Sequence, residues 1–153
     1  MLNLSILTPN KKLVTDLTVE EVLVPGFRGE LNILPGHARL VTTLSTGILR
    51  YRLAGKSDWN LVSVSWGYCE IKPNSIIILA ETAETSEELD ADRIGKALAF
   101  SVERLGSGAL EGEEITKYQR KHERALIRQE LLEVKSNSDG HTKGSNNNSN
   151  HTH

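Results

Sequence analysis

Three glycines in the middle of the chain have a spacing that could serve phosphate binding. Gly106, Gly108 and Gly112 loosely resemble a glycine-rich phosphate loop. Such a loop binds phosphate where a strand leads into a helix, because the first N–H groups of the helix then point at the anion. The residues before Gly106 have helical spacing instead. We therefore interpret these glycines as the turn of a helical hairpin and expect no phosphate site there.

The side chains that could act as nucleophiles, bases or metal ligands are few and scattered. His37 is the only histidine in the first 84 residues, whereas a zinc site needs three or four ligands. Cys69 is the only cysteine, which excludes an internal disulfide, and its apolar surroundings indicate a buried thiol. GxSxG, HExxH and GxxxxGK(S/T) motifs are absent from the sequence. We expect no catalytic residue, no metal site and no obligatory cofactor.

The composition argues against two classes of protein. The 153 residues include 18 basic and 20 acidic side chains, which gives a net charge of −2. Nucleic-acid binders concentrate basic residues because phosphate contacts supply most of their affinity, so we expect no nucleic-acid partner. The longest clear apolar run, residues 76–80, is far too short to span a bilayer. We expect a soluble chain that reaches a membrane only through another protein.

Alternating apolar residues and evenly spaced turn residues predict a β-domain in residues 1–84. Short apolar runs are separated by Pro, Gly and Asn, which is typical of an antiparallel sandwich or barrel. The predicted strands are residues 2–6, 17–24, 40–43, 48–53, 61–66, 68–72 and 75–80. We expect an antiparallel β-sandwich.

From Thr85 onward the apolar spacing becomes that of helices. Thr85 and Glu88 could form a capping box, and Asp90 is a second candidate N-cap. The predicted apolar face of the first helix comprises Ile94, Ala97, Leu98, Val102 and Leu105. After the glycine turn, a second helix opens with acidic residues and runs to about Val134. The short loop predicts an antiparallel helical hairpin in residues 85–135.

Residues 136–153 are dominated by Asn, Ser, His, Gly and Thr. Nothing in them offsets the entropy cost of ordering, so we expect a disordered low-complexity tail. The predicted fold class is therefore α+β, with an N-terminal antiparallel β-sandwich, a C-terminal antiparallel α-helical hairpin and this tail.

Residues 24–44 read VPGFRGELNILPGHARLVTTL. They closely resemble the signature of the epsilon subunit of bacterial F-type ATP synthase, which reads roughly GxxGxxGILPGHAPLVT. The matching residues are Gly26, Gly29, Ile33, Leu34, Pro35, Gly36, His37, Ala38, Leu40, Val41 and Thr42. Further segments resemble family motifs in the same order at residues 47–50, 67–74, 78–84 and 89–93.

Two positions depart from this family pattern. Asn32 stands where the family has glycine, and because asparagine tolerates a positive φ, we expect the turn to survive. Arg39 replaces a proline, which loosens one turn and adds a charge.

The resemblance implies a non-catalytic subunit of the rotating central stalk. In this family the β-domain binds the gamma subunit and rests on the ring of c subunits, and it couples the two during proton-driven ATP synthesis. Residues 26–37 resemble loops that face the ring, so Gly29, Glu30 and His37 are candidate contacts with the c ring or gamma. A turn-shaping role is the alternative, and we favour it for Pro35 and Gly36. The implied location is peripheral, on the cytoplasmic face of the bacterial plasma (inner) membrane.

The resemblance also implies that the hairpin regulates ATP hydrolysis. In the family it can extend along gamma to the alpha and beta catalytic subunits and block hydrolysis there. The candidate inhibitory contacts are the basic residues of the second helix, Lys117, Arg120, Lys121, Arg124 and Arg128. A solvated face is the alternative, because glutamates lie among these residues.

Some family members bind regulatory ATP between the two helices. Asp90 and Arg93 match the motif that opens the first helix, and Arg124 and Arg128 are the candidate partners on the second. An ordinary intrahelical pair of Asp90 with Arg93 explains the first two residues equally well. ATP is the only cofactor that the resemblance suggests.

A different class of protein fits the same predicted elements. A free-standing β-sandwich binding module with a helical tail would contain similar strands, but it would not need the ordered turn motifs or the basic second helix. A cupin-like enzyme would need several inward-facing metal ligands on its strands.

Overall fold

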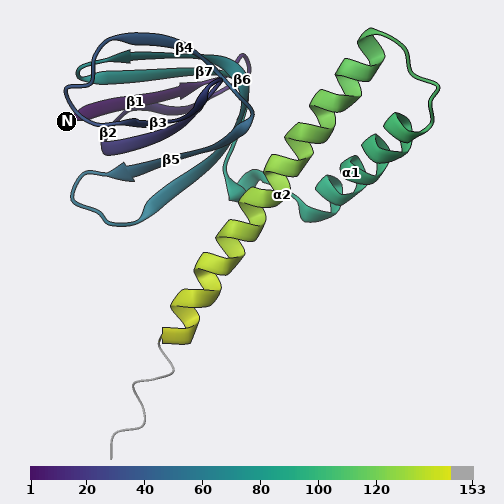
Figure 1. Cartoon of the computed structure of the whole chain (residues 1–153). Helices are drawn as coiled ribbons and strands as arrows, with labels where there is room; N and C mark the ends of the chain where they lie inside the picture. Colours follow the sequence, from purple (N-terminus) through teal and green to yellow (C-terminus); the bar gives the residue numbers. More distant parts are fainter. Residues whose placement is uncertain (146–153) are drawn as a thin grey trace, which may run out of the picture. The chain divides into compact units, whose positions relative to one another are not determined.

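A computed structural model describes the backbone of residues 1–145 and the side chains of residues 1–137. The chain forms two compact units, one of Met1–Glu88 and one that begins at Leu89 (Figure 1). The sequence had indicated a boundary after Glu84, whereas in the structure the division lies after Glu88. The reason is a short 3-10 turn, η1 (Ser86–Glu88), which stays with the first unit.

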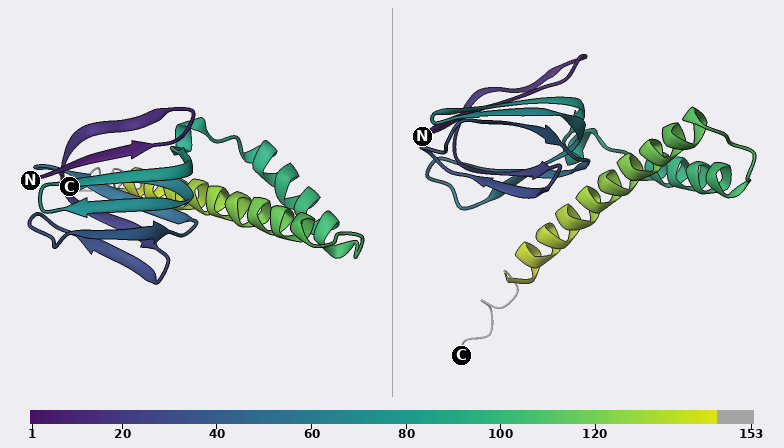
Figure 2. Two further views of the ribbon diagram at one scale, coloured as in Figure 1. Left: turned by 90° about the horizontal axis from the view of Figure 1, so that it is seen from above. Right: turned by 45° about the horizontal axis from the view of Figure 1, so that its top comes forward.

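The first unit is a seven-stranded β-sandwich, which confirms the predicted fold class. Its strands are β1 (Leu2–Leu7), β2 (Lys12–Gly26), β3 (Gly29–Ile33), β4 (Leu40–Leu44), β5 (Gly47–Leu53), β6 (Trp59–Lys72) and β7 (Ser75–Glu84). Paired strands are antiparallel except for β1 and β7, which run parallel. Because β1 pairs with both β7 and β2, the sheet curls into two facing layers (Figure 2).

Strand β6 is continuous, whereas the sequence predicted two strands interrupted at Gly67. Its first half pairs with β5 as far as Val64, and its second half pairs with β4 from Gly67 onward. The backbone φ angle is 37° at Trp66 and 141° at Gly67. The glycine is therefore a bend at which one strand passes from one layer to the other, and it is not a turn that ends the strand. Strand β2 also serves both layers, because it pairs first with β1 and then with β5 and β3.

The core consists of aliphatic side chains that point between the two layers. Successive residues of a strand point to opposite faces, so alternate positions fill this space. Fully buried side chains include Leu2, Leu4, Ile6, Ile33, Leu49, Ile71, Ile76 and Ile78. This core fixes the register of the strands and, with it, the residues that point outward.

The second unit is the predicted helical hairpin, made of α1 (Ala91–Gly106) and α2 (Glu113–Ser145), which lie side by side in antiparallel directions (Figures 1 and 2). In the loop between them, Gly108 has a φ of 71° and Gly112 a φ of 55°. These left-handed conformations favour glycine, which confirms the predicted turn at Gly108 and Gly112, while Gly106 is the last residue of α1.

The buried side of α1 differs from its predicted apolar face. Ile94 is buried, but Val102 is 59% exposed. Ser101 is buried instead, and its hydroxyl donates a hydrogen bond to the carbonyl of Ala97 at 2.8 Å. Because that bond satisfies the hydroxyl within its own helix, a serine can be buried on the inner side of α1. A prediction based on apolar residues alone does not identify such a position.

Helix α2 continues to Ser145, past the predicted end near Val134. Residues 136–145 of the predicted tail are thus helical, and residues 146–153 lie outside the described residues. Extending an existing helix fixes one residue per added hydrogen bond, which costs far less than starting a new helix, so a polar sequence can continue it. None of the helices in the described part of the chain is long and apolar enough to cross a membrane.

Candidate functional site

The outward side of strands β4, β6 and β7 carries large apolar side chains. Tyr68 is 60% exposed, Leu79 50% and Val41 68%. Tyr68 is the cross-strand neighbour of Leu79, and Leu79 is the neighbour of Leu7 on β1. On the other side Tyr68 faces Thr43 of β4. We call Val41, Tyr68 and Leu79 the outer apolar face.

An open hollow of about 610 Å³ adjoins this face. Its lining is almost wholly apolar and comes from the end of β1 and the middle of β6 and β7. The apolar side chains are Leu7, Pro9, Trp66, Tyr68 and Leu79, and the polar ones are Thr8 and Glu81. A hollow of this size could accept a large side chain of a partner protein.

The bend in β6 shapes the hollow. A φ of 37° is unusual for a bulky residue such as Trp66, and such strain persists only where the surroundings impose it. A Cβ on Gly67 would lie 1.9 Å from the carbonyl oxygen of Leu79, so the two strands touch backbone to backbone. Next to the bend, the hydroxyls of Ser65 and Thr82 are hydrogen-bonded across the strands.

The outer apolar face was not predicted from the sequence, although a signal for it was present. A sheet with one solvated side alternates apolar and polar residues, and residues 76–80 do not alternate. In β7, Ile76 and Ile78 fill the core, while Leu79 points outward. An unbroken apolar run in an antiparallel strand therefore indicated that both of its sides are meant to be covered.

The three residues predicted to contact the c ring or gamma lie on one continuous segment, β3 and the turn after it. Gly29 starts β3 with a φ of 126°, and Glu30 is exposed beside it, opposite Pro25 of β2. His37 is half-buried in the turn, where its Nδ1 lies 2.8 Å from the carbonyl oxygen of Ala38 and donates to it in the matching tautomer.

The structure shows the backbone of the turn before β4 and of Asn32, one of the two positions that depart from the family pattern. Gly36 has a φ of 84° and its N–H donates to the carbonyl of Pro73 at 2.9 Å, as a turn-shaping role requires. Asn32 lies in β3 opposite Leu23, and positive φ among the described non-glycine residues occurs only at Asp16 and Trp66. The expectation that Asn32 must tolerate a left-handed turn was wrong, because its backbone is extended.

Two observations bear on metal and thiol chemistry in the described residues. They contain no group of three or more His, Cys, Asp or Glu residues that could hold a metal ion. Burial raises the pKa of the Cys69 thiol to about 12, so the reactive thiolate is disfavoured. The arrangement suits binding through shape and surface.

Of the residues predicted to bind ATP, Asp90 and Arg93 lie at the start of α1, whereas Arg124 and Arg128 lie on α2. The carboxylate of Asp90 accepts the backbone N–H groups of Asp92 at 2.9 Å and Arg93 at 3.3 Å, so it caps the helix. A hollow of about 250 Å³ lies between α1 and α2 close to this cap, lined by Ala91, Ile94, Gln129, Leu132, Glu133 and Ser136. Arg124 and Arg128 are half-buried on α2.

The basic residues predicted to inhibit hydrolysis lie on one element, α2. Lys117, Arg120 and Lys121 are exposed. The Lys121 ammonium lies 5.3 Å from the ring centre of Tyr118, and that ring is 5.9 Å from the ring of Phe100 on α1. Cations over aromatic faces are attracted by the ring quadrupole, so this cluster joins the two helices near their connecting loop.

Comparison with known proteins agrees with this architecture. A family model described as ATP synthase, Delta/Epsilon chain, beta-sandwich domain matches residues 1–86. The ATP synthase epsilon chain of Bdellovibrio bacteriovorus is 42% identical over 128 residues, which cover 82% of this chain and 91% of that relative. The ATP synthase epsilon chain of Carboxydothermus hydrogenoformans is 41% identical, with 68% of this chain and 75% of the relative covered.

Solved structures share the fold. A chain in the Euglena gracilis mitochondrial ATP synthase assembly of OSCP, F1 and c-ring aligns with a TM-score of 0.71 at 22% identity, covering 87% of this chain and 79% of that one. A chain in the central stalk and c-ring of the Tetrahymena thermophila mitochondrial ATP synthase aligns with a TM-score of 0.55 at 13% identity, covering 86% and 96%. By its family-model match over residues 1–86 and its identity with curated relatives, the chain belongs to the ATP synthase epsilon chain family.

Proposed function

We propose that the chain is a non-catalytic subunit of the central stalk of a bacterial F-type ATP synthase. In this role the sandwich binds the gamma subunit and rests on the c ring, so that it couples their rotation to proton-driven ATP synthesis. The observation that carries the proposal is the outer apolar face, because isolated proteins rarely leave large apolar side chains clustered in the open. The names of the relatives, and the central-stalk and c-ring assemblies of the structural neighbours, support this choice of partners.

The outer apolar face is the proposed gamma contact. Tyrosine is enriched among residues that dominate interface energies, and Tyr68 lies between Leu79 and the β4 strand. Changing Tyr68 or Leu79 to Ser should weaken binding to purified gamma about tenfold or more. Trp59→Ser is the matched control, because Trp59 is 39% exposed on the half of β6 that pairs with β5. Equal binding by all three variants would rule out this face.

The β3 segment is the proposed c-ring contact. Glu30 is exposed there and His37 lies in the following turn, while Gly29 supplies a backbone conformation that few other residues adopt. In the reconstituted enzyme, a Glu30→Ala, His37→Ala double variant should retain gamma binding but lower ATP-driven proton pumping relative to ATP hydrolysis. Unchanged pumping would exclude both side chains from coupling. Through these contacts the chain would lie peripherally on the cytoplasmic face of the plasma membrane.

The helical unit is the proposed inhibitor of ATP hydrolysis. Its contacts with the alpha and beta subunits would come from Lys117, Arg120, Lys121, Arg124 and Arg128. A single exposed ion pair contributes only about 0.2–1 kcal/mol, so several must act together. Replacing Lys117, Arg120 and Lys121 by Gln should raise hydrolysis by the assembled enzyme, whereas Lys96→Gln on α1 should not. Equal hydrolysis by the triple variant and the wild type would exclude a role for these charges.

Regulatory ATP binding is a second proposal, and the hollow between α1 and α2 is the place proposed for it, although none of the four candidate ligands is among the residues that line the hollow. At about 250 Å³ it is slightly smaller than common ligand pockets of about 300–1,000 Å³, so ATP would have to widen it. The candidate ligands are Asp90, Arg93, Arg124 and Arg128. Calorimetric titration of the isolated chain should detect binding that Arg124→Gln weakens. Absence of heat at millimolar ATP would remove the proposal.

A further inference from the structure

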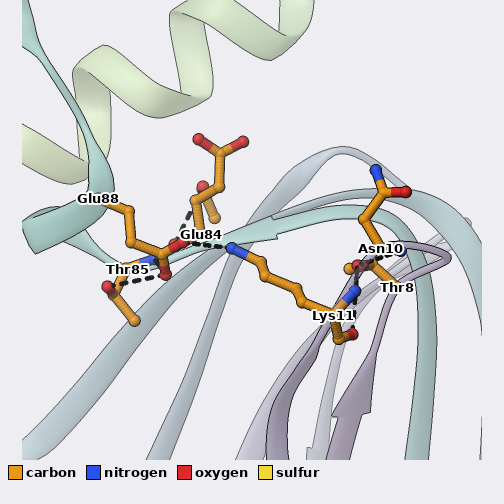
Figure 3. Close-up of polar contacts among 7 residues, drawn as sticks. Thr8, Asn10, Lys11, Glu84, Thr85 and Glu88 are labelled. Atoms are coloured by element: carbon orange, nitrogen blue, oxygen red, sulfur yellow. Dashed lines mark hydrogen bonds and ion pairs between the residues drawn. The ribbon is translucent and has the colours of Figure 1, made fainter.

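One side chain of the segment that follows β7 forms an ion pair with the body of the sandwich. Glu88 ends η1, and its carboxylate oxygens have separate tasks (Figure 3). Oε1 accepts the N–H and the hydroxyl of Thr85, each at 3.2 Å, which closes the turn locally. Oε2 accepts a charged hydrogen bond from Lys11 Nζ, which belongs to the turn between β1 and β2, 77 residues away in sequence.

The lysine is presented by a braced turn. The backbone N–H of Thr8 donates to the carbonyl of Lys11 at 2.9 Å, and the N–H of Lys11 donates to the Thr8 hydroxyl at 3.1 Å. The same hydroxyl accepts the N–H of Asn10 at 3.3 Å (Figure 3). Because the backbone of the turn is already fixed, only the lysine side chain has to be ordered when its ammonium binds a carboxylate.

The ion pair lies at the last residue before the division between the two units. The first unit ends at Glu88, and α1 begins at Ala91 under the cap of Asp90. Only Leu89 and Asp90 therefore connect the fastened turn to the helix. The hydrogen bonds of the turn at residues 85–88 share no atoms with the cap that Asp90 forms on α1. The turn can therefore open while the cap stays closed, and the reverse.

We propose that Lys11 and Glu88 form a latch that fixes the length of the tether between the sandwich and the helical unit. With the latch closed, the tether is Leu89 and Asp90. With it open, residues 85–88 join the tether and lengthen it by up to about 13–14 Å, at about 3.3–3.6 Å per extended residue. A shorter tether limits how far the helical unit can reach. Only this regulatory role of the latch rests on the proposed function; the latch itself does not.

The latch is weak enough to act as a switch. Both side chains are partly exposed, at 36% for Lys11 and 38% for Glu88, so water and salt compete with the pair. Exposed pairs of this kind shift an opening equilibrium by about two- to fivefold. An acidic or basic group of a partner chain that bound either side chain could therefore open it.

Proteolysis of the isolated full chain tests the latch without reference to the rest of the enzyme. A protease that cleaves after glutamate should cut after Glu87 and Glu88 about two to five times faster in Lys11→Gln than in the wild type. Cleavage after Glu111, in the loop between the helices, provides the internal reference. Lys12→Gln is the matched control, because Lys12 is exposed beside Lys11.

Two further comparisons distinguish the latch from general damage to the fold. Lys11→Arg keeps the charge and should be cut like the wild type, and about 0.5 M salt should bring the wild type to the rate of Lys11→Gln. Equal cleavage of Lys11→Gln and the wild type, relative to Glu111, would overturn the latch. That result would not bear on gamma binding. In the same way, the gamma binding of Tyr68→Ser does not bear on the latch, so each experiment can contradict one proposal and leave the other standing.

Discussion

At the scale of single residues, Gly67 has the most specific requirement. It lies at the bend of β6 with a φ of 141°, and the Leu79 carbonyl oxygen occupies the place of a side chain. Gly67→Ala should therefore lower the free energy of unfolding by about 3 kcal/mol or more, because strain and a backbone clash add together. Urea denaturation measures this loss.

Gly55→Ala provides the matched control for that prediction. Gly55 also has a positive φ, of 75°, but a Cβ there would meet no atom within 4 Å. Its cost should be about 1–2 kcal/mol, which is the strain alone. A Gly67→Ala variant no less stable than Gly55→Ala would contradict the close approach of β6 and β7.

The buried thiol of Cys69 makes a second prediction at this scale. With its pKa raised from 9.0 to about 12 by burial, the thiolate population at pH 8 falls about a thousandfold. Alkylation of the native chain should thus be at least a hundredfold slower than alkylation in denaturing urea. Similar rates in the two states would show that the core around β6 opens readily.

At the scale of elements, the cap of α1 can be tested by itself. Asp90→Ala removes the acceptor of two backbone N–H groups and should cost the helix about 0.5–2 kcal/mol. Hydrogen exchange at the amides of Asp92 and Arg93 should accelerate accordingly. Asp92→Asn serves as the control, and equal exchange in the two variants would exclude capping.

The sequence predicted those elements whose causes are local. The N-cap at Asp90 and the glycine turn between the helices follow from side-chain chemistry and backbone freedom, and both are confirmed. The continuity of β6 depends on its pairing with other strands, with β5 before the bend and with β4 after it, so the sequence pattern predicted two strands separated at Gly67. The outward position of Tyr68 and Leu79 was not predicted, because the sequence of one strand does not show which of its two sides faces the core and which faces another protein.

At the scale of the whole molecule, the position of the boundary predicts how the chain can be divided. Residues 1–88 contain all seven strands and the latch, so this fragment should fold by itself. A fragment of residues 1–84 lacks Glu88 and should be less stable by up to about 1 kcal/mol. Thermal unfolding of both fragments measures the difference, and a more stable 1–84 fragment would contradict the observed boundary.

Two carboxylates have a lowered pKa in the folded chain and so predict a loss of stability in acid. The pKa of Glu20 is held below its ordinary value of 4.5 by the N–H of Gly55 and by Arg52. For Glu88, burial acts to raise the pKa, but the Lys11 and Thr85 hydrogen bonds together lower it below 4.5.

A pKa lower in the folded than in the unfolded state stabilises the fold above about pH 4.5, and this contribution is lost as the pH falls through the folded-state value. Urea midpoints should decline between pH 5.5 and pH 3, and a Glu20→Gln, Glu88→Gln double variant should show a shallower decline. An identical slope would assign acid sensitivity to other groups.

The passage of β2 and β6 through both layers has a mechanical consequence. In a sandwich whose layers meet only through side chains, a sideways force lets one sheet slide over the other. Here two strands cross from one layer to the other, so covalent bonds resist that shear. A load applied to one face reaches the opposite face through the polypeptide backbone, and the block deforms little before it passes the load on.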